Sequence, residues 1–262
     1  MLIEQIWLDN PWRNFNYLIA CEESSEALAI DPLDHKRCLQ VAADHGWTIK
    51  QICNTHEHPD HIEGNQALIE ATGASLLAPS GSAALIPGAD QELKDSETIT
   101  VGKSVSLKVI DSPGHTMHHL CLYGENGSPA LFCGDTLFNA GVGNCHNGGD
   151  PEILFKTITE KISKLPNHTR LYPGHDYMQH NLGFTLDREP GNRAAQLLLD
   201  RLSAQSPHSP ITTLGEEKEV NTFFRLESKE IIEGLKAQFE DLDQHSEPLE
   251  LFLKLRLLRD NW

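Results

Sequence analysis

The feature that most constrains what this chain can fold into is the heptapeptide THEHPDH at residues 55–61. Its three histidines and one aspartate directly follow an apolar run, TIKQICNT (48–55), that predicts a buried strand. Imidazole nitrogens and a carboxylate are ligands that suit Zn²⁺, Fe or Mn²⁺. Because Pro59 cannot lie inside a helix, we expect the heptapeptide to be a loop whose side chains can converge.

Three further runs place a histidine or an aspartate just after a strand-like segment. They are SPGH at 112–115, CGDT at 133–136 and YPGH at 172–175. A single residue of this kind is more often a cap or a hydrogen-bonding group than a ligand. Four such strand ends are different, because in layered α/β folds these loops lie at one edge of the sheets, where sites form.

The candidate ligands are too numerous for one four-coordinate ion. They are His56, His58, Asp60, His61, His115, Asp135 and His175. Two metal ions that share one bridging carboxylate account for the whole set, with three histidines at one ion and two histidines and an aspartate at the other. Such a pair lowers the pKa of a bridging water and polarises a carbonyl group, which is hydrolytic chemistry without a protein nucleophile.

The order of strand-like and helix-like segments predicts an α/β region followed by a helical one. Up to the YPGH run, short apolar runs alternate with amphipathic segments, of which 34–45 and 151–164 are the clearest helices. Beyond it, strand signals disappear and helices are expected at 188–205, 228–245 and 249–262. We therefore expect a catalytic domain over residues 1–174 and a helical, substrate-binding domain over residues 175–262.

Composition limits the partners. The 262 residues include 21 Lys+Arg against 38 Asp+Glu, a formal charge of −17, which disfavours both nucleic acid and an anionic membrane surface. No run approaches the length of an apolar membrane span, and the N-terminus lacks the pattern of a secretory signal. The six cysteines form no CxxC pair, so we expect reduced thiols. These features predict a soluble protein in the cytoplasm, or in an organelle after processing. We also expect a monomer.

The motifs together resemble a known superfamily. The HxHxDH loop, SPGHT, GDTLF and PGH occur in the order typical of the metallo-β-lactamase superfamily. Further runs are similar to its glyoxalase II (hydroxyacylglutathione hydrolase) branch, namely GDTLFNAGVG (134–143), GHDY (174–177), NLGFTLDREPGN (181–192) and VNTFFR (220–225). The resemblance spans essentially the whole chain. It implies a four-layer αββα sandwich with a C-terminal helical domain.

The resemblance also implies residue roles. One metal ion would be bound by His56, His58 and His115, the other by Asp60, His61 and His175, with Asp135 and a hydroxide bridging the two. Zn²⁺ is favoured, with Fe or Mn²⁺ as the alternatives. The implied reaction is hydrolysis of S-D-lactoylglutathione to glutathione and a D-hydroxy acid, in methylglyoxal detoxification. Asp60 and Asp135 would be its catalytic residues, with Asp60 orienting the hydroxide that attacks the thioester.

Substrate contacts are implied at Tyr177 and, near the C-terminus, at Arg256 and Arg259, which could hold a carboxylate of glutathione. The two arginines could instead form a basic face of the terminal helix. The loop after GDTLF departs from the branch, since Asn144 and His146 stand where a Lys or Arg and then a Tyr or Phe are expected. We hypothesise that this loss of one cation weakens glutathione binding.

Other functions fit parts of the pattern. A persulfide dioxygenase shares the first motif but uses one iron, and a hydrolase of a different thioester would keep the same centre. A tRNA-processing nuclease is disfavoured by the acidic charge. A β-lactamase would lack the helical region, and a binding module could retain the ligands without activity.

Three residues near the motifs have no assigned chemistry. His118 and His119 are either solvated or packing residues, or one of them supports a ligand, and no nucleophilic role is assigned to Cys145.

Overall fold

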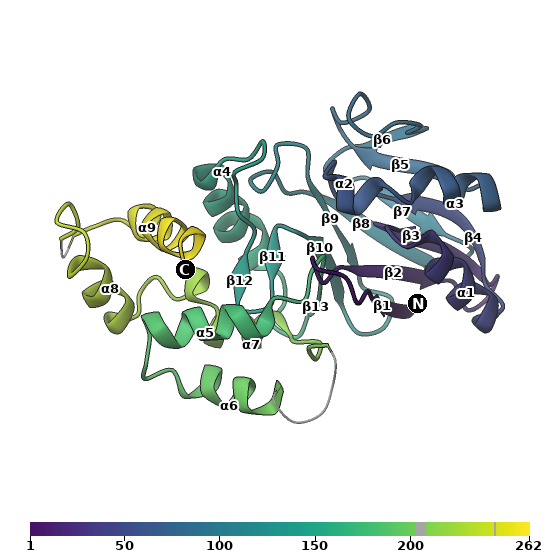
Figure 1. The fold of residues 1–262 in the computed structure, drawn as a ribbon. Coiled ribbons are helices and arrows are strands. Elements are labelled where there is room, and N and C mark those ends of the chain that lie inside the picture. The colour runs from purple at the N-terminus through teal and green to yellow at the C-terminus, as the bar shows by residue number, and fades with distance from the viewer. Residues whose placement is uncertain (203–207, 244) are drawn as a thin grey trace.

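Two β-sheets pack face to face in the computed structural model, which describes residues 1–202, 208–243 and 245–262 (Figure 1). The first sheet contains, in spatial order, β1 (Leu2–Trp7), β2 (Phe15–Ala20), β3 (Glu26–Ile30), β4 (Thr48–Cys53), β5 (Ser75–Pro79) and β6 (Gln91–Leu93). The second contains β13 (Arg170–Pro173), β10 (Ala130–Gly134), β9 (Leu120–Gly124), β8 (Val105–Asp111) and β7 (Thr98–Val101). A separate hairpin is formed by β11 (Leu137–Phe138) and β12 (Gly141–Val142).

Alternating side chains of the strands fill two apolar layers. In β2, Phe15, Tyr17 and Ile19 point between the sheets and join apolar residues of the second sheet. Leu18 and Ala20 point the other way, toward helices α1 (His35–His45) and α3 (Asn65–Thr72). Successive side chains of a strand face opposite sides, so an uninterrupted apolar strand such as β2 is buried on both faces.

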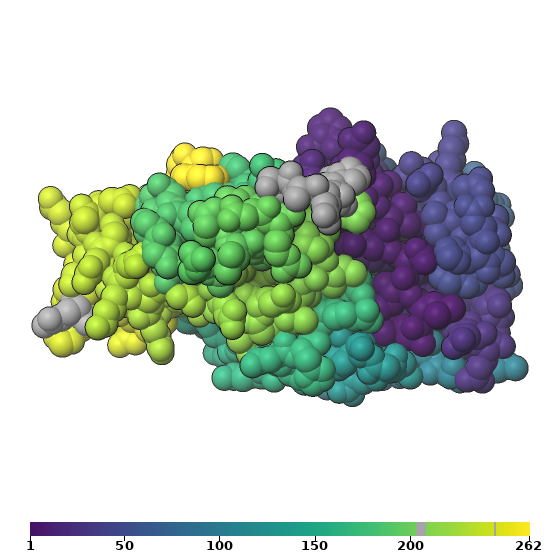
Figure 2. Space-filling model, turned by 90° about the horizontal axis from the view of Figure 1, so that it is seen from below, coloured from purple at the N-terminus to yellow at the C-terminus, as the bar shows by residue number. Residues whose placement is uncertain are grey.

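Helices cover the outer face of the second sheet as well. They are α4 (Pro151–Lys156) with its continuations η1 (Thr157–Lys161) and η2 (Ile162–Lys164), and the C-terminal elements α5 (Met178–Arg188), α7 (Leu214–Val220), η3 (Thr222–Phe224), α8 (Lys229–Lys236) and α9 (Pro248–Asp260). Helix α6 (Arg193–Leu202) packs on α5 and α7 instead. One apolar cluster joins Leu131 of β10, Leu154 of α4 and Phe252 of α9. The layers confirm the expected αββα sandwich. Figure 2 shows the C-terminal helices, green and yellow, gathered at one end of the molecule.

Three of the helices differ from the sequence prediction. The expected helix at 151–164 changes to a π turn at Thr157, whose hydroxyl donates to the carbonyl oxygen of Pro113 rather than within the helix (2.6 Å). The helix expected from 188 starts at Arg193, because Pro190 and Gly191 break it. Its predicted residues 203–205 lie outside the described part of the chain.

The predicted helix at 228–245 ends early, at Lys236. Phe239 and Leu242 turn back and pack into the apolar cluster beneath α9, which a continuous helix would not allow. Residue 244 lies outside the described residues.

No sequence pattern predicted β1, α5 or α7. None of the described helices is both long enough and apolar enough to cross a membrane.

A buried carboxylate holds the C-terminal helices together. Glu189, at the end of α5, accepts hydrogen bonds from Nε and Nη2 of Arg225 (both 2.6 Å), from the Ser228 hydroxyl (2.6 Å) and from Nδ2 of Asn192 (2.7 Å). Burial raises the pKa of Glu189, but these hydrogen bonds outweigh burial and keep its pKa below the ordinary value. The network explains why the REPGN and VNTFFR runs occur together, since each supplies part of it.

We expect Glu189→Gln to lower the melting temperature by about 4–8 °C, because a charged acceptor of four hydrogen bonds is replaced by a group that is partly a donor. Circular dichroism during heating measures this change. The matched control is Asp241→Asn, which removes an exposed ion pair with Lys254 (2.6 Å) and should leave the melting temperature nearly unchanged. Equal losses in the two variants would contradict the role of the Glu189 network.

Candidate metal centre and adjoining pocket

The candidate ligands follow strands that end at one edge of the sandwich. β8, β10 and β13 run in the same direction, because β9 is antiparallel to both β8 and β10 while β13 is parallel to β10. His115, Asp135 and His175 follow these three strands. His56 follows β4 of the facing sheet, and a hydrogen bond from Leu120 N–H to the Thr55 carbonyl oxygen joins the two sheets there (2.9 Å).

The heptapeptide is not entirely a loop, which corrects the prediction made from Pro59. Pro59 is the first residue of a short helix, α2 (Pro59–Ile62), where the missing N–H of proline costs no hydrogen bond. Asp60 and His61 lie in this helix and His58 precedes it. The prediction was wrong about the local structure, although the side chains converge as expected.

The structure brings all seven predicted residues together in two groups. In the first, Nδ1 of His58 lies 3.1 Å from Nε2 of His56 and 3.1 Å from Nε2 of His115. The second group is Asp60, His61 and His175, in which the two Nε2 atoms are 3.2 Å apart and Asp60 Oδ2 lies 3.3 Å from His175 Nε2.

Asp135 lies between the two groups. Its Oδ2 is 3.5 Å from Nε2 of His115 in the first group and 3.3 Å from Nε2 of His175 in the second. Its Oδ1 is 3.5 Å from Nε2 of His61 and is buried without a hydrogen-bond partner within the described part of the chain. A buried carboxylate oxygen left in this way is costly unless a cation or a donor reaches it.

Hydrogen bonds on the outer nitrogens determine which ring nitrogens carry lone pairs. Three rings donate to backbone carbonyl oxygens, namely His115 to Asn144 (2.6 Å), His175 to Trp12 (2.7 Å) and His58 to Asn147 (3.1 Å). His61 Nδ1–H donates to Asp31 (2.9 Å), and His56 Nδ1–H to the Thr55 hydroxyl (3.0 Å). The five inward nitrogens are therefore acceptors that face one another.

This donor set fits metal ions. Nitrogen atoms that lie 3.1–3.2 Å apart and both carry lone pairs repel one another unless a metal ion or a proton lies between them. Burial lowers the pKa of His56 well below its ordinary value and that of His115 to about 4, so these two rings are neutral ligands. Burial also lowers the pKa of His61, but the negative charges of Asp135 and Asp31 outweigh the effect of burial and raise that pKa to about 9. The position of the His61 ring therefore favours positive charge. The chain therefore has a site able to hold two metal ions.

Two residues outside the predicted ligand set support this centre. Asp31 accepts from the Thr55 N–H (2.8 Å) and hydroxyl (2.7 Å) as well as from His61. The sequence contains a signal for it, because Asp31 directly follows strand β3, as the other candidate groups follow theirs, and β3 is parallel to the strand that precedes the heptapeptide. His119 is fully buried, and its Nε2 accepts from the N–H of Asp135 (3.1 Å), so it supports a candidate ligand rather than lying in solvent. His118 is exposed.

The glycines of the strand-end motifs lie so close to neighbouring atoms that a side chain would not fit there. A Cβ added at Gly174 would lie 2.3 Å from Oδ1 of Asp135 and 2.9 Å from the His61 ring. A Cβ at Gly134, which has a φ of +45°, would lie 2.5 Å from the Thr55 hydroxyl. These close approaches explain the PGH and GDT runs.

A pocket of about 210 Å³ adjoins the centre and gathers all five predicted substrate-binding residues. It is lined by Phe138, Val142, Asn144, His146, Tyr177, Asn181, Arg256, Arg259 and Asp260. The Tyr177 ring stacks on His175 with the ring centres 4.9 Å apart, which links the pocket to the second group of ligands.

The two arginines of α9 differ in their surroundings. Arg256 is buried, and it donates through Nη1 to the carbonyl oxygens of Val142 (3.0 Å) and Gly143 (3.2 Å). Its Nε (3.0 Å) and Nη2 (2.6 Å) bind Oδ1 of Asp260. Arg259 donates from Nε and Nη2 to Oδ1 of Asn181. The exposed His146 places Nε2 3.3 Å from the other oxygen of Asp260.

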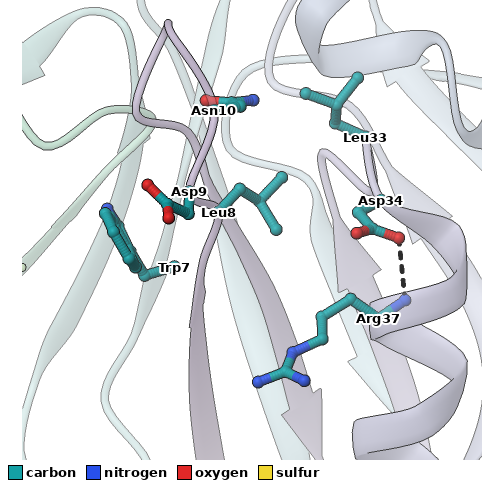
Figure 3. Close-up of a pocket in the computed structure, with 7 residues that line it drawn as sticks. All are labelled: Trp7, Leu8, Asp9, Asn10, Leu33, Asp34 and Arg37. Carbon is teal, nitrogen blue, oxygen red and sulfur yellow. Dashed lines mark hydrogen bonds between the residues drawn. The ribbon is translucent and has the colours of Figure 1, made fainter. Parts of the chain in front are cut away.

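Two other features lie outside this chemistry. Cys145 is half-buried, and burial raises its thiol pKa to about 12, so it stays protonated and is no nucleophile. A hollow of about 440 Å³ lies between the end of β1 and the start of α1, lined by Trp7, Arg37 and five other residues (Figure 3). It contains none of the candidate ligands.

The fold and this double cluster of histidines and carboxylates define a protein of the metallo-β-lactamase class. The model of the metallo-β-lactamase superfamily matches residues 19–175, and the model described as hydroxyacylglutathione hydrolase C-terminus matches residues 176–262. Hydroxyacylglutathione hydrolases of Nitrosococcus oceani and a Polaromonas species are 56% and 52% identical to this chain, each over 100% of both chains. The chain belongs to the hydroxyacylglutathione hydrolase family.

Solved structures agree with the fold. The crystal structure of ETHE1 from Myxococcus xanthus is similar, with a TM-score of 0.68 and 25% identity over 99% of this chain and 98% of that one. A protein crystallised in a di-iron-bound form has a TM-score of 0.60 and 25% identity, covering 84% of this chain and 99% of its own.

We expect Asp31→Asn to weaken metal binding about 10- to 100-fold, because the ring of His61 loses the acceptor that fixes its orientation. Titration of the metal-loaded protein with a competing chelator measures the affinity for Zn²⁺. Asp111→Asn is the matched control, since Asp111 is half-exposed at the end of β8 and its carboxylate pairs only with Lys161 among the charged side chains described. An unchanged affinity for Zn²⁺ in Asp31→Asn would contradict the role of Asp31 in orienting the His61 ring.

Proposed function

We propose that this chain hydrolyses the thioester of an S-2-hydroxyacylglutathione, with S-D-lactoylglutathione as the expected substrate. The products would be glutathione and a D-hydroxy acid, a step of methylglyoxal detoxification. The observation that carries the proposal is the pair of ligand groups sharing Asp135, next to a pocket that presents Arg259 and Tyr177. The names of the close relatives support the choice of substrate.

We propose His56, His58 and His115 as ligands of one metal ion, Asp60, His61 and His175 as ligands of the other, and Asp135 as the bridge. Bound divalent ions would supply Lewis acidity that activates water near neutral pH and stabilises charge on the carbonyl oxygen. Zn²⁺ is the proposed metal and Fe or Mn²⁺ the alternatives, because imidazole and carboxylate ligands accept all three.

The protein groups orient the reactants. Asn14 donates to Oδ2 of Asp60 (3.0 Å), and Asp60 is partly exposed, so its carboxylate can accept a proton from the attacking water. The water oxygen bonds to the acyl carbon and the C–S bond breaks. The sulfur leaves as a thiolate, whose ordinary pKa of about 8.5 makes a strong general acid unnecessary. We propose that Tyr177, Asn144 and His146 contact the glutathione part, with Arg259 at its carboxylate.

We propose residues 1–174 as the catalytic domain and 175–262 as the substrate-binding domain, since the latter supplies Tyr177 and Arg259. We also propose that the chain acts as a monomer in the cytoplasm. All the ligands and pocket residues come from one chain, and six free thiols suit a reducing compartment. Size-exclusion chromatography with light scattering tests the monomer.

Freshly purified protein should release thiol from S-D-lactoylglutathione, and the same sample should contain about two metal ions per chain. Oxygen uptake with a persulfide and a single iron per chain would instead support the dioxygenase alternative. Turnover of other acyl thioesters but not of the glutathione thioester would support a hydrolase of different specificity.

We expect Asp135→Asn to lose both the metal and the activity, because the amide cannot supply two anionic oxygens between the ligand groups. Metal analysis and thiol release on one preparation measure both quantities. Full activity in this variant would contradict the bridging assignment.

We expect Asn144→Lys to lower the KM for the glutathione thioester several-fold with little change in kcat, because it adds a cation at the pocket. Ser128→Lys is the matched control. It adds the same charge at the exposed turn between β9 and β10, at the opposite end of the strands. A KM unchanged by Asn144→Lys, or lowered equally by Ser128→Lys, would count against weakened binding through the loss of a cation here.

A further inference from the structure

Of the two arginines that line the pocket, Arg259 alone has no carboxylate partner among the residues that the structure describes. The Arg256 guanidinium already binds two carbonyl oxygens and Asp260, so its charge is paired and four of its five N–H groups are used. Arg259 binds a neutral partner only, and its Nη1 has no hydrogen bond to any residue that the structure describes. Its remaining donors are therefore available to an anionic group in the pocket.

One side chain holds Arg259 in this arrangement. The Oδ1 atom of Asn181, on α5, accepts from both Nε (3.2 Å) and Nη2 (3.0 Å) of Arg259. The Nδ2 atom of the same amide donates to the carbonyl oxygen of Asn139 in the turn of the β11–β12 hairpin (2.9 Å). Asn181 is 3% exposed, so it has little freedom to move.

The orientation of this amide is fixed by its partners. A flipped amide would place its NH₂ group against two N–H donors and its oxygen against a carbonyl oxygen. The hairpin also packs tightly on it, since a Cβ added at Gly141 would lie 2.6 Å from Nδ2. Asn181 is therefore locked between the hairpin and the guanidinium.

We infer that Asn181 is a positioning residue that presents the free edge of the Arg259 guanidinium to a carboxylate of the substrate. The inference rests on the proposed function for the identity of that carboxylate, which belongs to the glutathione part. Side chains of arginine lose much conformational freedom on binding, and a guanidinium held in advance binds with less loss. Asparagine suits this role because it holds the guanidinium without neutralising it, whereas an aspartate would pair with the charge.

A double-mutant cycle tests the inference with S-methylglutathione, a thioether that binds without being hydrolysed. Isothermal titration calorimetry on the metal-loaded protein gives the dissociation constant. We expect Arg259→Gln to raise it about 10- to 100-fold and Asn181→Ala about 5- to 10-fold. In the Arg259→Gln background, Asn181→Ala should change it less than about 2-fold, because the two residues act through one contact. Independent, additive effects would overturn the inference.

Asn221→Ala is the matched control. Asn221 donates to the carbonyl oxygen of Gly141 in the same hairpin (3.0 Å) but makes no contact with Arg259. Any effect of Asn221→Ala should therefore persist in the Arg259→Gln background. If its effect vanished there as well, the hairpin and not the amide–guanidinium contact would be responsible, and the inference would fail.

Arg259→Lys keeps the test decisive if Asn181→Ala does not fold, which circular dichroism would reveal. Lysine keeps the charge but cannot place two donors on Asn181. A dissociation constant raised nearly as much as in Arg259→Gln supports orientation, and a value close to that of the unchanged protein overturns it. Binding is measured without turnover, so a chain that binds S-methylglutathione but hydrolyses no thioester would refute the proposed function alone.

Discussion

The structure depends on the hydrogen bonds made by the outer nitrogens of five histidines. Each bond leaves the inward nitrogen as an acceptor, and the resulting lone pairs face one another around Asp135. Their partners come from distant parts of the chain, including the carbonyl oxygens of Trp12 and Asn144 and the carboxylate of Asp31. The two sheets must therefore meet in one register for the centre to form. Lone pairs so close together repel one another unless a metal ion or a proton lies between them.

The C-terminal helices are joined to this centre through the β11–β12 hairpin. Glu217 of α7 is fully buried and accepts from the N–H of Ala140 (2.7 Å), a residue with a φ of 57°, and from the Thr212 hydroxyl (2.6 Å). Burial raises the pKa of Glu217 to about 7 even though these donors lower it. Arg256 then fixes the backbone after the hairpin, where Asn144 receives the bond from His115. The helices thus help to set the position of a candidate ligand.

The pocket presents a positive charge although the chain as a whole is strongly negative. A formal charge of −17 repels an anionic thioester at long range, although salt screens that repulsion beyond about 10 Å. Within the pocket, Asp260 neutralises Arg256 and lies near His146, so the attraction for a carboxylate falls mainly on Arg259. The neutral amide of Asn181 keeps that charge available.

The sequence alone determined the four strand ends, the seven candidate ligands and the change to a helical region, because ligand chemistry and apolar periodicity are local properties. It could not predict where α4 and α8 end. Thr157 donates to the carbonyl oxygen of Pro113 and Phe239 packs against an apolar cluster, and these partners lie far away in the sequence. Nor could it separate Arg256 from Arg259, which lie one turn apart on the same helix. Only the tertiary structure decided that Arg256 is buried against the carbonyl oxygens of Val142 and Gly143 and that Arg259 contacts Asn181, because hydrogen-bond partners 78 to 114 residues apart leave no periodic pattern in the chain.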